Sequence, residues 1–193
     1  MILFFEIEPY CEPINIFEKI GERKTELSND SLSFICGVIK ENKPHKIVEV
    51  GVSAGGTSCV IMKCLENLNL DSKVYSVDLA YTYHYNELKP CGYQLQDAQP
   101  YLTNINNNIL MLGKTIAEQI DKIMEDGKKI DMLILDTIHY LPGELLDFIV
   151  CMPFLAKKAC VICDDLLFAH EGENTQALAT KVLFDTVVAD KLI

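Results

Sequence analysis

Short apolar segments alternate with helical segments along most of this chain, and that alternation limits the possible fold more than any other feature. Caps such as Ser28 and the capping box from Thr115 to Glu118 mark helix starts. Continuous apolar strands between amphipathic helices predict an α/β fold, with a Rossmann-like, doubly wound, mostly parallel sheet in a three-layer α/β/α domain. Five segments are predicted to be strands: 46–50, 73–77, 108–112, 130–135 and 159–163.

Composition is consistent with one globular domain and narrows the kind of ligand. The chain has 193 residues, of which 49% are hydrophobic and 23% charged, enough for one sizeable core. The net charge is -11 and Arg23 is the only arginine. Phosphate binding needs clustered Lys and Arg, so this balance disfavours nucleic acid and suits small neutral or cationic ligands.

The cysteines and the N-terminal residues indicate in which cellular compartment the protein is expected. Most of the eight cysteines lie in apolar runs, as expected of reduced, buried residues. Cys160 and Cys163 form a CxxC pattern within a strand, where positions i and i+3 face opposite sides and cannot easily share a zinc ion. The start of the chain lacks the basic region of a signal peptide, and no apolar run is long enough for a bilayer. We therefore expect a cytoplasmic protein with no membrane partner.

The stretch VEVGVSAGGTS, residues 48–58, contains the GxSxG pattern of a serine hydrolase, with Ser53 as its nucleophile. Acids and histidines follow in the required order, as Asp136 or Asp164 and then His139 or His170. A hydrolase elbow, however, follows a central strand, whereas this one would follow the first. The hydrolase interpretation is therefore the less favoured one.

The same stretch resembles a nucleotide-type glycine turn. Gly51 and Gly56 match the outer glycines of GxGxxG, but Ser53 stands at the middle position, where its side chain would intrude on a pyrophosphate. A nucleoside ligand without a pyrophosphate fits better. Glu49 is expected to accept a hydrogen bond from a ligand ammonium group, and Asp78 to accept both hydroxyls of a ribose.

This combination resembles the class I S-adenosylmethionine-dependent methyltransferases, in particular the cephalosporin-hydroxylase-like and macrocin O-methyltransferase-like proteins. The matching segments, within residues 33–167, are EVGVSAGG, VYSVD, IDMLILDTIHYLPGELLDF and KKACVICDDL. The resemblance implies transfer of a methyl group from S-adenosylmethionine to an oxygen of a small or saccharide-type acceptor. It places Glu49, Gly51, Ser53, Gly55 and Asp78 at the cofactor. The alternative is a non-catalytic ligand-binding or assembly module with the same fold.

In that family some members bind a divalent ion at the ends of the fourth and fifth strands. The matching residues here are Asp136, Asp164 and Asp165, whose oxygens would suit Mg²⁺ or Ca²⁺. Asp136 and His139 are also the candidate catalytic residues, with His139 as the base for the acceptor hydroxyl. The alternative is structural: the two later acids cap a turn or helix, Asp136 orders the turn at Thr137, and His139 has no catalytic part.

Two further segments stand apart from the alternating pattern. Residues 1–27 form an N-terminal extension, and residues 79–107 are long for a connection between strands. This second segment holds five of the eight tyrosines, and either closes over the site as a lid or packs on the sheet. Little room remains for the antiparallel strand pair that usually ends the sheet of class I methyltransferases. We expect the last two strands to be lacking, or the sheet to be completed in a homo-oligomer.

Overall fold

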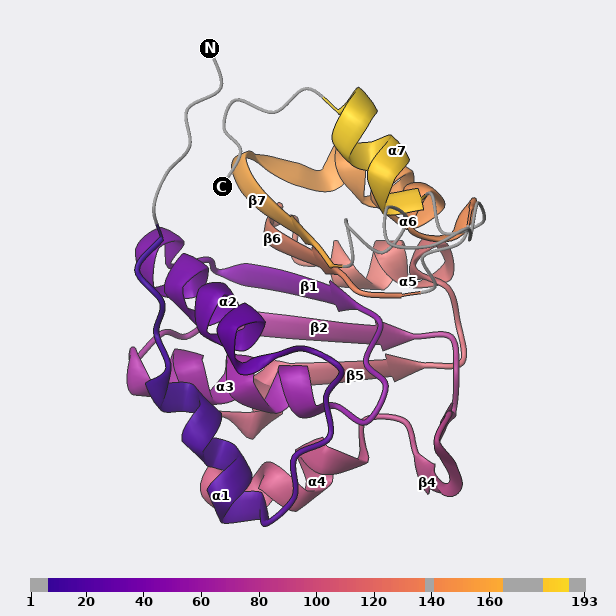
Figure 1. Cartoon of the computed structure of the whole chain (residues 1–193). Coiled ribbons are helices and arrows are strands. Elements are labelled where there is room, and N and C mark those ends of the chain that lie inside the picture. Colours follow the sequence, from indigo (N-terminus) through magenta and orange to yellow (C-terminus); the bar gives the residue numbers. More distant parts are fainter. Residues whose placement is uncertain (1–6, 138–140, 165–178, 188–193) are drawn as a thin grey trace.

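Five parallel strands form the central sheet (Figure 1). The computed structural model describes residues 7–137, 141–164 and 179–187. All five predicted strands are present, three of them with the predicted bounds, and their order across the sheet is β5-β2-β1-β6-β7. They are β1 (Lys46–Val50), β2 (Lys73–Asp78), β5 (Asn108–Leu112), β6 (Ile130–Leu135) and β7 (Leu155–Cys163).

Strand order reverses at β1, and this reversal determines where a ligand can bind. From β1 the chain proceeds to β2 and β5 on one side, then crosses to β6 and β7 on the other. The loops after β1 and β6 therefore diverge and leave a crevice at the carboxyl edge of the sheet. The predicted doubly wound parallel sheet is confirmed for the described residues.

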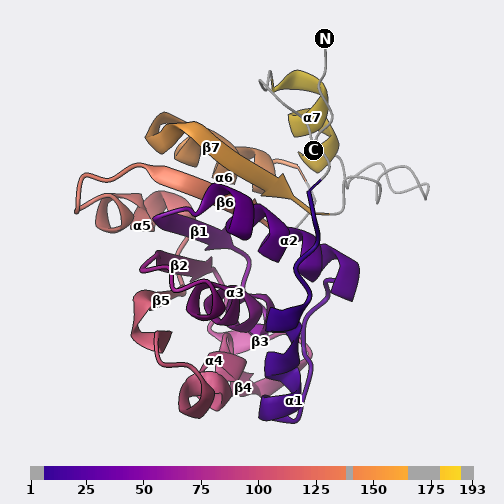
Figure 2. The ribbon, with the colours of Figure 1, turned by 90° about the vertical axis from the view of Figure 1, so that its left-hand side faces the viewer.

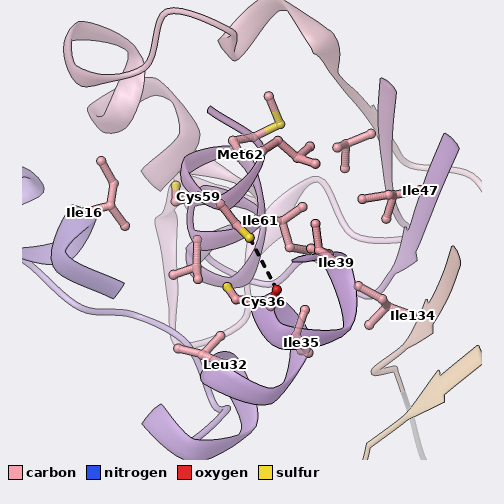
Figure 3. Close-up of a cluster of buried hydrophobic side chains, with 14 of the residues drawn as sticks. Ile16, Leu32, Ile35, Cys36, Ile39, Ile47, Cys59, Ile61, Met62 and Ile134 are labelled. Atoms are coloured by element: carbon pink, nitrogen blue, oxygen red, sulfur yellow. Dashed lines mark hydrogen bonds between the residues drawn. The ribbon is translucent and has the colours of Figure 1, made fainter. Parts of the chain in front are cut away.

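Helices cover both faces of the sheet, which gives the predicted three layers (Figures 1 and 2). Strand side chains alternate between the faces, so Ile47 packs in one buried cluster and Val48 in the other. Figure 3 shows the first cluster, where Ile39, Ile61 and Ile134 meet from two helices and the sheet. The first face carries α2 (Asn29–Asn42) and α3 (Gly56–Asn67); the second carries α5 (Ile116–Ile123), α6 (Gly143–Cys151) and α7 (Ala179–Thr186).

Local signals in the sequence account for two helix starts. The Ser28 side chain accepts the backbone amide of Ser31 at 3.0 Å and caps α2. At α5, the predicted capping box forms between Thr115 and Glu118. Both helices therefore begin where the sequence indicates.

The buried face of α6 differs in part from the face that its large apolar residues indicate. The sequence suggests Leu145, Leu146, Ile149 and Met152, yet Leu146 and Ile149 are exposed, and Met152 falls in the exposed 3-10 helix η4 (Met152–Phe154). The buried residues of α6 are instead Glu144, Phe148 and Cys151. The backbone amide of Thr137 donates to Glu144 at 3.1 Å, and this polar contact turns Glu144 inward.

The two segments that break the alternation lie next to each other. Residues 79–107 form a hairpin and short helices: β3 (Thr82–Tyr83), β4 (Asn86–Pro90), α4 (Tyr93–Ala98), η2 (Gln99–Tyr101) and η3 (Ile105–Asn107). The N-terminal extension supplies η1 (Glu12–Asn15) and α1 (Ile16–Ile20), which pack against α3, with α1 also against α4 (Figure 2). Part of the long connection thus packs on the body of the protein, while the hairpin reaches the carboxyl edge.

All eight cysteines are free, as expected. Cys160 packs against the first buried cluster and Cys163 against the second, so the CxxC pair does point to opposite faces. Within the described ranges, no helix has the length and apolar character needed to cross a membrane.

Candidate functional site

A cavity of about 250 Å³ lies at the carboxyl edge of the sheet, where the strand order reverses. A larger hollow, of about 360 Å³, is lined by Arg23 and the start of α2 and receives no residue from a strand end. The smaller cavity gathers four of the residues that the sequence singles out: Gly51, Ser53, Asp136 and Asp164. Its lining residues are Thr25, Glu26, Gly51, Val52, Ser53, Gly56, Thr57, His84, Asp136, Thr137 and Asp164.

The glycine turn after β1 forms the floor of this cavity. Gly51 has a φ of 97°, and a Cβ atom there would lie 1.7 Å from the backbone oxygen of Asp136. Only glycine therefore allows the ends of β1 and β6 to meet this closely. Gly55, with a φ of 91°, is the N-cap of α3 and flanks the cavity without lining it.

Asp78, at the end of β2, holds the turn from its other side. One carboxylate oxygen accepts the backbone amides of Val52 at 2.8 Å and Ser53 at 3.0 Å, and the other accepts that of Ala80 at 2.8 Å. These bonds occupy both carboxylate oxygens, and Asp78 lies next to the cavity without lining it. Its binding of the two ribose hydroxyls stays a prediction.

Glu49 lies elsewhere than the sequence suggests. Its side chain is 1% exposed and turns into the layer between the sheet and α3, where Oε2 accepts the hydroxyls of Ser58 at 2.5 Å and Ser76 at 2.7 Å. Burial raises the Glu49 pKa to about 7. Glu49 does not line the cavity, and its other carboxylate oxygen, Oε1, is buried with no hydrogen-bond partner among the described residues. Its contact with a ligand ammonium stays a prediction.

Among the described residues, the surroundings of Ser53 lack the geometry of a hydrolase. Its hydroxyl donates to Glu26 Oε1 at 3.2 Å, and His84 Nε2 lies 3.7 Å from the same oxygen. The carboxylate thus stands between the hydroxyl and the imidazole, whereas a catalytic triad needs the imidazole in the middle. The other histidines considered for a hydrolase, His139 and His170, lie outside the described residues.

Two of the three predicted metal ligands share the cavity. Asp136 and Asp164 both line it, because their backbone amides continue the ladders beyond β6 and β7 by bonding to the oxygens of Val50 and Leu135. The described part of the chain contains no cluster of three His, Cys, Asp or Glu able to hold a metal. Asp165 and the candidate base His139 fall outside that part. Two carboxylates in one cavity are a partial donor set for a hard cation.

Several site residues carry no sequence signal that identifies them. Thr25 and Glu26 come from the N-terminal extension, with no motif around them. On α6, Glu144 and Asp147 both contact Thr137, and burial raises the Asp147 pKa to about 6. Their i, i+3 spacing is the one feature that would place them on the same face of a helix.

Comparison with known proteins supplies the family. A family model described as a methyltransferase domain matches residues 48–166, more than half of the chain. The chain belongs to this methyltransferase family. The matched range includes the glycine turn, Asp78 and the ends of β6 and β7, and the resemblance seen in the sequence is confirmed.

Solved structures share the fold of this methyltransferase at low identity. A putative O-methyltransferase from Klebsiella pneumoniae has a TM-score of 0.62 at 14% identity, covering 90% of this chain and 74% of its own. TomG from Streptomyces achromogenes has a TM-score of 0.61 at 13% identity, covering 95% and 77%. A putative caffeoyl-CoA O-methyltransferase from Staphylococcus aureus has a TM-score of 0.57 at 20% identity, covering 91% and 78%. No curated protein matches the chain.

Proposed function

We propose that this methyltransferase transfers the methyl group of S-adenosylmethionine to a hydroxyl oxygen of a small acceptor. The observation that carries the proposal is the glycine turn after β1, braced by Asp78 beside a polar cavity at the switch point of the sheet. Two proteins of the same fold support the choice of cofactor: TomG, solved in complex with S-adenosylmethionine, and a Bacillus cereus O-methyltransferase, solved with the demethylated product.

The residues present fit such a cofactor. Asp78 would accept the ribose hydroxyls, and the backbone of Gly51, Ser53 and Gly55 forms the turn against which the sugar and amino-acid end would lie. The cavity is smaller than the usual ~300 to 1,000 Å³ of a ligand pocket, so it suits the methionine end with the nucleoside toward Asp78. When bound, the cofactor supplies an electrophilic methyl group.

The chain's own contribution to the reaction would be positioning and removal of one proton. Holding the acceptor oxygen in line with the methyl group supplies much of the rate. Asp136 lines the cavity, and we propose that it lies beside the acceptor with His139 as the base. Asp136, Asp164 and Asp165 would hold a divalent cation such as Mg²⁺. MycE, a methyltransferase of the mycinamycin pathway with a TM-score of 0.53, was solved with Mg and the demethylated product.

Calorimetry with S-adenosylmethionine and S-adenosylhomocysteine tests the proposal directly. We expect binding of both, and release of the demethylated product when a panel of hydroxylated small molecules and sugars is supplied. Binding of neither would refute the proposed function, whereas binding without turnover on any acceptor would favour the non-catalytic module. A saccharide-type acceptor, a cytoplasmic location and a homo-oligomer remain proposals, and sedimentation velocity tests the last of them.

A further inference from the structure

The segment between α1 and α2 is fastened across the N-terminal end of α3 (Figure 1). The side chain of Gln94, on α4, is fully buried. Its Oε1 accepts the backbone amide of Lys24 at 3.2 Å, and its Nε2 donates to the backbone oxygen of Glu22 at 3.1 Å. The Thr25 and Thr57 hydroxyls are 2.9 Å apart. Contacts from two helices thus fix the position of the residue that follows, Glu26.

The segment also packs tightly on the start of α3. A Cβ atom on Gly56 would lie 2.2 Å from the Lys24 backbone oxygen, so only a glycine at position 56 allows the backbone of Lys24 to approach α3 this closely. The Glu26 side chain consequently reaches the turn, where Oε1 accepts the Ser53 hydroxyl and lies 3.7 Å from His84 Nε2. Among the described residues both contacts fall on Oε1, which leaves Oε2 available to a ligand.

The charge of the cavity suits a cation. Its lining includes the acidic residues Glu26, Asp136 and Asp164, and no lysine or arginine is among the described residues that line it. The methionine end of the proposed cofactor has an ammonium group, which requires a carboxylate or carbonyl acceptor. Glu49, the acid of the motif, is buried and does not line this cavity, whereas Glu26 does.

We propose that Glu26, from the N-terminal extension, binds the ammonium group of the cofactor's methionine end. The inference rests on the proposed function and assigns one contact within it. Asp136 and Asp164 are at the ends of β6 and β7, on the side proposed for the acceptor, whereas Glu26 contacts the side chain of Ser53 in the turn itself. The segment before α2 would then be part of the cofactor-binding site.

The experiment compares four ligands by calorimetry on the full chain and its Glu26→Gln variant. S-adenosylmethionine, S-adenosylhomocysteine and decarboxylated S-adenosylmethionine all carry the ammonium group, and 5′-methylthioadenosine lacks it. We expect the variant to bind the first three about tenfold more weakly, since a charge-assisted hydrogen bond becomes a neutral one. Its affinity for 5′-methylthioadenosine should stay within twofold.

Glutamine keeps the size of the side chain and its acceptor for Ser53, so folding should be unaffected, as thermal denaturation will show. The matched control is Glu18→Gln, an exposed residue of α1 in the same extension and outside the cavity lining, which should change no affinity. If the Glu26 variant bound the three ammonium ligands as tightly as the unaltered protein, the inference would be overturned but the proposed function would stand. The same holds if the variant bound 5′-methylthioadenosine more weakly by the same factor as the three ammonium ligands. Failure of the unaltered protein to bind any of the four would overturn the proposed function as well.

Discussion

The Asp78 carboxylate accepts the backbone amide of Ser53 at 3.0 Å, so the end of β2 holds the glycine turn that follows β1. Two strands adjacent in the sheet thereby fix the shape of the turn without a ligand. The same carboxylate oxygen also accepts the amide of Val52, and the two bonds preorganise the floor of the cavity.

Asp78→Ala should abolish measurable binding of S-adenosylmethionine. The change removes the brace of the turn together with the acceptor proposed for a ribose hydroxyl, and hydrogen bonds to a charged group contribute about 1.5 to 3 kcal/mol each. Calorimetry measures the affinity, with Asp121→Asn on the exposed side of α5 as the control. An Asp78→Ala protein that retained full affinity would show that Asp78 has no part in the cofactor site.

Ser53→Ala should leave cofactor affinity within about tenfold, because the backbone amide that bonds to Asp78 is retained and only a neutral hydrogen bond to Glu26 is lost. The unaltered protein should hydrolyse p-nitrophenyl acetate no faster than buffer does. An esterase activity that disappeared in the variant would restore the serine hydrolase interpretation.

Comparing Gly51→Ala with Gly127→Ala separates the loss of stability caused by steric overlap from the loss caused by backbone strain. Both glycines have positive φ, but the new Cβ would lie 1.7 Å from the Asp136 oxygen at Gly51 and meets nothing within 4 Å at Gly127. We expect Gly127→Ala to lower the free energy of unfolding by about 1 kcal/mol. Gly51→Ala should lower it by about 4 kcal/mol or more. Urea denaturation measures both, and similar losses would contradict the close approach of β1 and β6.

Glu49 should make stability fall as pH rises. Burial favours the neutral acid, so its pKa is about 7 in the folded protein and near 4.5 in the unfolded chain. Between these pH values only the unfolded state loses the proton, and the folded state is disfavoured by a total of about 3 kcal/mol once pH exceeds 7. Glu49→Gln should therefore gain about 3 kcal/mol of unfolding free energy over the unaltered protein between pH 4 and pH 8.

The control for that measurement is Glu41→Gln, an exposed residue near the end of α2, whose difference from the unaltered protein should stay constant with pH. Parallel pH curves for the Glu49 variant and the unaltered protein would mean that Glu49 titrates normally and is not buried as described.

Asp164→Asn should weaken divalent cation binding if the acids at the strand ends hold a metal. Mn²⁺, followed by electron paramagnetic resonance, is a suitable probe because it shares the oxygen preference of Mg²⁺. We expect one bound Mn²⁺ in the unaltered protein and at least a tenfold loss of affinity in the variant. No bound Mn²⁺ in the unaltered protein would favour the structural interpretation of these acids.

Much of the fold follows from short-range patterns. The strands β1, β5 and β6 have the bounds that their apolar runs predict, and α2 and α5 begin at their caps, because each signal spans only a few consecutive residues. The location of the site follows as well, since parallel strands bring their carboxyl ends to one edge. Asp136 and Asp164 do line the same cavity.

The orientation of individual side chains depends on packing across the sequence. Glu49 is beside the glycine turn in the chain, yet strand alternation turns it inward, where Ser58 and Ser76 from other elements receive it. On α6, Glu144 is buried and accepts the amide of Thr137, whereas the apolar Leu146 and Ile149 are exposed.

The sequence by itself determined the parallel sheet, the turn after its first strand and the family, because these depend on periodicity and on residues close together in the chain. Only the tertiary structure brought Glu26 to Ser53, 27 positions away, through the hydrogen bonds of Gln94 and the absence of a side chain on Gly56. No local pattern encodes such a contact, since it exists only once two helices and the N-terminal extension have packed together.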